Sequence, residues 1–104
     1  MSKKYRIRVL PSAEADMDEL EQHIEEQCSA PITAARHFKQ LYQLLYWLEE
    51  YAELPAVNVE LSIQYGKIIR NIRFGKKKTI IYSVDDNVVY IHRIMPQGMI
   101  IFSE

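Results

Sequence analysis

The segment from Phe74 to Arg93, with the sequence FGKKKTIIYSVDDNVVYIHR, gathers side chains that could carry chemistry. Its last two residues are His92 and Arg93. A histidine with an ordinary pKa of about 6.5 can move a proton near neutral pH, and a fixed cation can stabilise negative charge developing on a phosphate. The same residues fit three roles: an active site, a nucleic-acid contact, or a hairpin whose charges simply face water.

A run of three lysines, Lys76, Lys77 and Lys78, interrupts two stretches rich in β-branched residues and marks a hairpin tip. Lysines at such a tip keep a sheet edge from pairing with another chain. Alternatively they contact phosphate, and binding would then weaken steeply with salt. The sheet shows no run of exposed aromatic residues that would serve as a platform for single-stranded nucleic acid, so the tip favours the first interpretation.

Arg70 precedes this hairpin on its own strand. It could bind a phosphate, or it could pair with an acidic helix residue such as Glu25 or Glu49. A metal-free ribonuclease needs a general acid or base and at least one well-placed cation. The candidates for those catalytic roles are Arg70, Lys78, His92 and Arg93.

His92 alternates with Val88 and Tyr90, so all three should share one face of a strand. The sequence shows no carboxylate or cysteine companion for this histidine. Its alternative role is that of a polar surface residue.

The elements that position these residues can be read from their periodicity. Lys4 to Leu10 alternates between apolar and basic residues, which predicts a half-buried strand. Pro11 ends it, Ser12 is a candidate N-cap, and apolar residues at helical spacing predict a helix over 13–28. A second and longer helix is predicted from Pro31 to Leu54.

The second helix carries more apolar surface than one sheet-facing stripe requires, because Leu44, Trp47, Tyr51 and Leu54 form a further stripe. In one interpretation the first helix packs there to form an antiparallel helical hairpin. In the other, the stripe is a docking face, and Trp47 and Tyr51 are its natural anchors. Lys76 and Lys77 are further candidates for contacts with a protein partner.

After Pro55 no clear period is present, and a connecting loop is predicted. Three strands follow, at Lys67–Phe74, Lys78–Val84 and Val88–Met95, and the last two are joined by a tight polar turn. The sequence thus predicts an α+β fold: an N-terminal strand and a two-helix hairpin packed on a mainly antiparallel four-stranded sheet. The strand order beyond the hairpins stays open.

Length and composition fit one domain spanning residues 1–104. The net charge of −1 argues against a general nucleic-acid binder, but it is unevenly divided: residues 1–60 carry −5 and residues 61–104 carry +4. No secretory signal or membrane-spanning run is present, so we expect a soluble, cytoplasmic protein. Cys28 is the only cysteine, and we expect no disulfide, no metal site and no cofactor.

Three quoted stretches, in order, resemble the RelE/ParE superfamily of bacterial toxins, also known as the plasmid stabilisation family: YRIRVLPSAEADMDELEQHIEE, AARHFKQLYQLLYWLEEYAELP and IIRNIRFGKKKTIIYSVDDNVVYIHRI. The resemblance covers about residues 5–96. It implies a growth-inhibiting toxin of a type II toxin–antitoxin pair, silenced by a cognate antitoxin in a hetero-oligomer or dimer. It also implies one of two targets: messenger RNA cleaved on the ribosome, as by RelE-like members, or DNA gyrase, as for ParE-like members.

The RelE-like pattern would place an arginine on the strand that ends in Tyr82, and basic residues with His or Tyr after the last strand. This chain has Thr79 with Lys78 beside it, and Met95 to Glu104 contains no Arg, Lys, His or Tyr. The departure favours the ParE-like, non-nucleolytic branch. Two alternatives remain: a ribosome-dependent endoribonuclease that uses the four candidates named above, and a degenerate member that retains only antitoxin binding.

Overall fold

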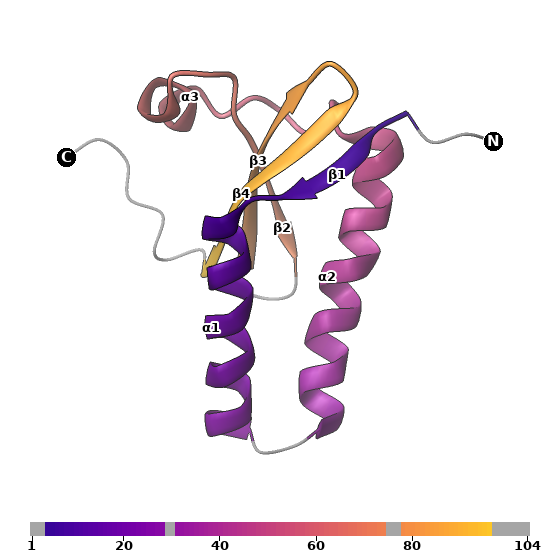
Figure 1. The fold of residues 1–104 in the computed structure, drawn as a ribbon, viewed down its shortest axis with the longest axis vertical. Coiled ribbons are helices and arrows are strands. Elements are labelled where there is room, and N and C mark those ends of the chain that lie inside the picture. Colours follow the sequence, from indigo (N-terminus) through magenta and orange to yellow (C-terminus); the bar gives the residue numbers. More distant parts are fainter. Residues whose placement is uncertain (1–3, 29–30, 75–77, 97–104) are drawn as a thin grey trace.

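The computed structural model describes residues 4–28, 31–74 and 78–96. Within them the chain forms four strands and three helices (Figure 1): β1 (Arg6–Val9), α1 (Pro11–Cys28), α2 (Pro31–Tyr51), α3 (Val59–Tyr65), β2 (Arg70–Phe74), β3 (Lys78–Asp85) and β4 (Val88–Pro96). The predicted α+β fold is confirmed. Helix α1 starts at its proline, a residue suited to the first helical position because its missing N–H would have no helical partner there.

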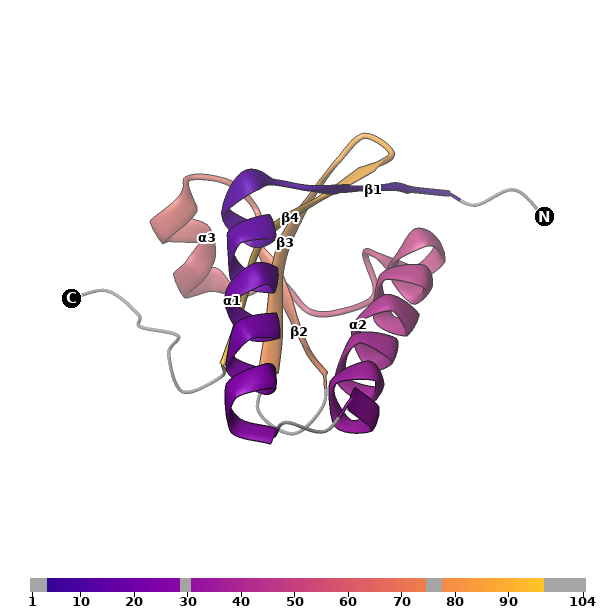
Figure 2. The same cartoon turned by 60° about the horizontal axis from the view of Figure 1, so that its bottom comes forward.

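The four strands form one sheet in the order β1-β4-β3-β2. Both hairpins are antiparallel, and β1 pairs with β4 in parallel, with Arg8 beside Tyr90. The sheet is therefore mainly antiparallel, as predicted, and the parallel edge strand settles the order that the sequence left open. Figures 1 and 2 show α1 and α2 running in opposite directions, with the C-terminal end of α1 and the N-terminal end of α2 extending beyond the strands.

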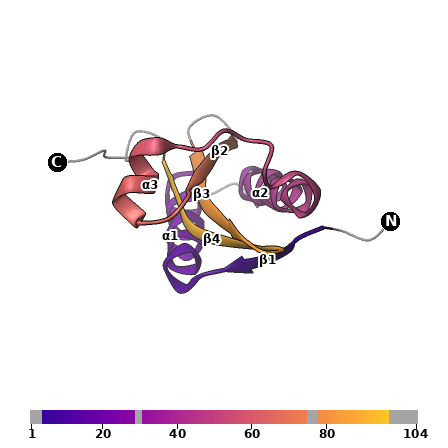
Figure 3. The same cartoon turned by 90° about the horizontal axis from the view of Figure 1, so that it is seen from above.

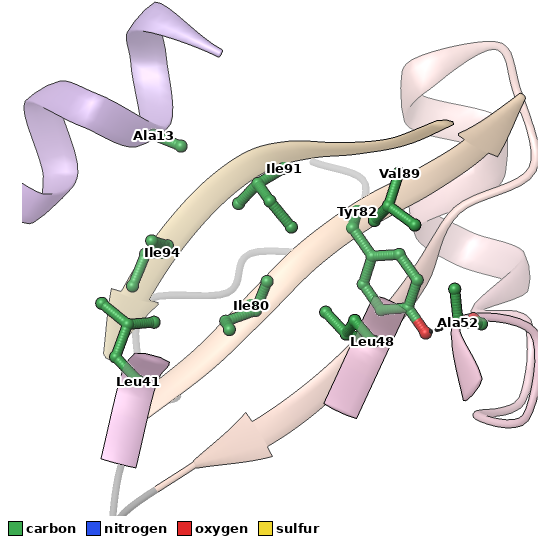
Figure 4. Packing of buried hydrophobic residues seen from close by; sticks show 9 residues of the cluster. All are labelled: Ala13, Leu41, Leu48, Ala52, Ile80, Tyr82, Val89, Ile91 and Ile94. Atoms are coloured by element: carbon green, nitrogen blue, oxygen red, sulfur yellow. Dashed lines mark hydrogen bonds between the residues drawn. The ribbon is translucent and has the colours of Figure 1, made fainter. Parts of the chain in front are cut away.

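The main core lies between these two helices and one face of the sheet (Figure 4). It contains Leu41 and Leu48 of α2, together with Ile80 and Tyr82 of β3, all fully buried. The Tyr82 hydroxyl donates a hydrogen bond of 2.7 Å to the carbonyl of Ala52. Burial raises the pKa of Tyr82, so the phenol stays protonated and this donor is kept.

The stretch predicted as a loop after Pro55 contains α3, and that prediction was wrong. Asn58 caps the helix by accepting a hydrogen bond of 3.0 Å from the Leu61 amide, and Gly66 ends it with φ of 71°. Leu61 packs with Ile69 and Ile81 on the second face of the sheet. Figure 3 shows α3 and α2 on opposite sides of the strands.

Two predicted boundaries move by three residues each. Helix α2 ends at Tyr51, one turn before the predicted Leu54. In the turn that follows, the Leu54 amide donates a hydrogen bond of 3.0 Å to the carbonyl of Tyr51. Strand β2 starts at Arg70, three residues after the predicted Lys67, because α3 and its Gly66 cap occupy the preceding segment.

A β-bulge at His92 shifts the register between β3 and β4. Ile81 pairs with Arg93 while Tyr82 pairs with Ile91, so His92 is the extra residue on β4. On either side of the bulge, Ile91 and Ile94 both reach the main core, although three residues separate them. Strict alternation would have put these two isoleucines on opposite faces.

Past the end of β1, the edge of β4 is closed by Asp16 in the second turn of α1. The carboxylate, only 8% exposed, accepts a hydrogen bond of 2.9 Å from the Ile94 amide. It also accepts from Nε and Nη2 of Arg93, at 2.7 and 3.1 Å. One acidic side chain therefore satisfies a main-chain donor and a guanidinium, and it holds α1 on the sheet.

We expect Asp16→Ala to lower the free energy of unfolding by about 2 kcal/mol, because the Ile94 amide and the Arg93 guanidinium both lose their partner. Urea denaturation monitored by circular dichroism measures this. The matched control is Asp18→Ala, an exposed carboxylate on the same helix, which should change stability by no more than about 0.5 kcal/mol. Equal effects of the two substitutions would contradict the role of Asp16.

Candidate functional site

The side of the sheet that faces away from α1 and α2 is called the open face here; α3 covers part of it. Arg8, Tyr90 and Ser83 lie side by side across β1, β4 and β3, since each is in register with the next. Residues in register share a face. Arg6 lies two positions before Arg8, so both exposed arginines of β1 belong to the open face.

A pocket of about 490 Å³ opens on this face between the end of β1, the strand hairpin and the segment after α3. Its lining residues are Leu10, Lys67, Ile68, Ser83, Val84, Asp85, Tyr90 and His92. The volume falls within the range of small-molecule sites, roughly 300–1,000 Å³. His92 and Tyr90 line the same pocket, as their alternation in the sequence suggested.

The polar wall of the pocket consists of His92 and Ser83. His92 Nε2 lies 2.8 Å from the Ser83 hydroxyl oxygen, and the imidazole contacts the Tyr65 ring edge-on, with ring centres 5.4 Å apart. Burial lowers the pKa of His92, and the positive charge of Lys67 lowers it further. The imidazole is therefore neutral at pH 7, and a neutral imidazole next to a hydroxyl can act as a general base.

Arg70 does not reach this pocket's His92–Ser83 pair. Its guanidinium donates to the carbonyl of Glu53 at 3.1 Å and to the carbonyl of Pro55. Both acceptors follow the end of α2, so the arginine fixes the chain where it leaves the helix and places a cation where the helix dipole is negative.

The four predicted catalytic residues are not brought together. Arg70 and Lys78 lie at opposite ends of the β2–β3 hairpin, paired with Tyr82 and Phe74. Phe74 lies four residues after Arg70 on the same strand, so the backbone positions of Arg70 and Lys78 are about 13 Å apart along the strands. His92 and Arg93 are consecutive, but one binds Ser83 and the other binds Asp16.

The predicted partner-binding stripe of α2 divides in two. Trp47 is half-buried against the main core, whereas Tyr51 is 47% exposed; their ring centres lie 5.3 Å apart. Leu54 is also exposed. The other predicted contacts, Lys76 and Lys77, lie outside the described residues.

The sequence did not single out Arg6, Arg8, Lys67 or Ser83. The alternation of the first strand did place both arginines on one face. Nothing local indicated that this strand would lie parallel to β4, next to Tyr90. The approach of Ser83 to His92 depends on the register of β3 against β4, in which Ser83 lies beside Tyr90.

Within the described parts of the chain, no three His, Cys, Asp or Glu side chains are grouped so that they could hold a metal ion. In the same residues, no helix is both long enough and apolar enough to span a membrane.

Comparisons with known proteins agree with this fold. A family model described as "ParE toxin of type II toxin-antitoxin system, parDE" matches residues 7–101. A solved structure, "Chromosomal ParDE TA system from P. aeruginosa", superposes with a TM-score of 0.70 at 16% sequence identity, covering 91% of this chain and 98% of that chain. At this identity the superposition supports the fold alone. Among curated proteins, none matches this sequence.

We expect the native state to lose stability as the pH falls below about 6.5, where the unfolded chain takes up a proton at position 92 but the folded chain, with its lowered His92 pKa, does not. His92→Gln should remove this part of the pH dependence. Urea midpoints between pH 7.5 and 5 measure it, and His23 and His37 are retained in both proteins. Identical pH profiles for the two proteins would contradict a buried, neutral His92.

Proposed function

Because the chain belongs to the ParE toxin family of type II toxin–antitoxin systems, we propose that it arrests growth by binding DNA gyrase and that its cognate antitoxin prevents this. The family match covers residues 7–101, nearly the whole described fold. The proposal keeps the ParE-like branch that the sequence favoured.

The observation that carries the proposal is the separation of the candidate catalytic groups. Cleaving an RNA phosphodiester requires a base at the 2′-hydroxyl and a cation at the same phosphate, within hydrogen-bond reach of the reacting atoms. Arg70 and Arg93 instead bind groups of the protein itself. Their engagement in structural contacts favours a toxin that acts by binding rather than by cutting.

For the antitoxin, we propose a contact with the exposed end of α2. Tyr51 and Leu54 are 47% and 71% exposed. Exposed aromatic side chains are common anchors of protein interfaces. Trp47 lies beneath Tyr51 and supports its ring, which makes Trp47 a core residue that also shapes the proposed contact.

A second candidate function is ribosome-dependent cleavage of messenger RNA. One observation favours it: the neutral imidazole of His92 next to the Ser83 hydroxyl, in a pocket that also includes Lys67. In this case His92, one of the four predicted catalytic residues, would be the general base, but Arg70 and Lys78 would take no part.

Pulse labelling after tight induction in a bacterial host distinguishes the two targets. We expect thymidine incorporation to stop before amino-acid incorporation, because gyrase inhibition blocks replication first. His92→Gln should arrest growth as the parent does. An early stop in amino-acid incorporation that disappears with His92→Gln would instead support the ribonuclease.

We expect Tyr51→Ala to weaken the complex with the co-expressed antitoxin about tenfold while leaving the fold intact, because an exposed anchor is lost. Trp47→Ala should instead lower the free energy of unfolding by about 2 kcal/mol, because part of the core is removed. Affinity is measured by calorimetry and stability by urea denaturation. Tyr42→Ala, an equally exposed tyrosine on the opposite side of α2, is the control and should bind like the parent.

A further inference from the structure

We infer that the pocket on the open face binds a nucleoside monophosphate, held through its phosphate by Lys67 and the arginines of β1 and through its base by Tyr90. This inference does not depend on which target the toxin has. It rests on three cations that have no carboxylate partner in the described parts of the chain, on the shape of the pocket and on its neutral polar wall.

The basic residues in and beside the pocket favour an anionic ligand. Lys67, Arg6 and Arg8 have no carboxylate partner among residues 4–28, 31–74 and 78–96, in contrast to Arg93, which is paired with Asp16. Asp85 is the one carboxylate among the described residues that line the pocket. Within the lining, the charges of Lys67 and Asp85 cancel, so the two excess positive charges come from Arg6 and Arg8 on the adjoining strand. Two positive charges match the charge of a phosphate monoester better than that of a single carboxylate.

Lys67 belongs to the pocket lining, and Arg8 lies next to this lining on the strand that adjoins the lining residue Tyr90. Lys67 lines the pocket and acts electrostatically on His92 within it. Arg8 lies on the strand next to Tyr90, in register with it, and strands are about 4.8 Å apart. A phosphate at the mouth of the pocket would therefore lie between the ammonium of Lys67 and the guanidinium of Arg8, with Arg6 one step further along the same strand.

The remaining walls suit a flat ring. Tyr90 is half-buried in the lining, and Leu10 and Ile68 add apolar surface. Bases of nucleotides stack on exposed tyrosine rings, and such stacking tolerates any base. On the polar wall, the Ser83 hydroxyl and the neutral imidazole of His92 can donate or accept hydrogen bonds without adding charge.

The test uses the full chain, labelled with ¹⁵N and titrated with adenosine 5′-monophosphate, ribose 5-phosphate, inorganic phosphate and a 5′-phosphorylated single-stranded hexanucleotide. We expect the mononucleotide to shift the amides of Leu10, Ser83 and His92, and to bind more tightly than ribose 5-phosphate or inorganic phosphate. Equal affinity for inorganic phosphate would overturn the inference, since it would show only a general anion site. The absence of shifts at these residues would overturn it as well.

The hexanucleotide identifies the source of the ligand. Tighter binding of the strand than of the mononucleotide would support the inference with the end of a nucleic acid as the source. Equal or weaker binding would support it with a free nucleotide as the source.

Three substitutions act on separate parts of the proposed site. Lys67→Ala should weaken mononucleotide binding about tenfold or more, since a charge-assisted contact is lost, whereas Lys39→Ala, an exposed lysine of α2, should leave it unchanged. Asp85→Asn should tighten binding because it removes the opposing charge. Tyr90→Leu should abolish the preference for the mononucleotide over ribose 5-phosphate. If Lys67→Ala and Lys39→Ala bind alike, or if Asp85→Asn weakens binding, the assigned site is wrong.

Discussion

The extra residue in β4, His92, sets which side chains in the second half of this strand face the helices. Val89, Ile91 and Ile94 all contribute to the main core, and without the bulge a regular strand would turn Ile94 away from the helices. His92 itself contacts Ser83, and the bulge brings the Ile94 amide beyond it to Asp16. The core position of Ile94 and the docking of α1 thus follow from one inserted residue, and bulges commonly serve to redirect a side chain in this way.

The two faces of the sheet use their charged residues differently. On the side of the helices, Arg70 and Tyr82 make structural hydrogen bonds to the main chain. Arg70 donates to carbonyls after α2, and Tyr82 donates to the carbonyl of Ala52. On the open face, Arg6 and Arg8 are exposed; Arg6 lies beside Val88 and Arg8 beside Tyr90. The second half of the sequence carries an excess of basic residues. The parallel pairing of β1 with β4 adds two more cations, Arg6 and Arg8, from near the start of the chain.

Periodicity was enough to predict most of the fold. Alternation defined the strands, the spacing of Leu41, Leu45 and Leu48 defined the core face of α2, and the polar turn at Asp85 defined a hairpin. Helix α3 was missed because seven residues are too few to show a period, although Asn58 and Gly66 are a recognisable pair of caps. The site was less predictable. Arg8 and Ser83 join it only because distant strands pair, and Arg70 binds main-chain carbonyls, which no pattern of residue types indicates.

The proposed binding of this toxin to gyrase is tested by the supercoiling of relaxed plasmid by purified gyrase in the presence of increasing amounts of the purified chain. We expect supercoiling to fall as the chain is added and to recover when the cognate antitoxin is supplied in excess. Relaxation by a topoisomerase I, run in parallel, should be unaffected. Undiminished supercoiling at the highest concentration of a chain that still arrests growth in cells would contradict the account.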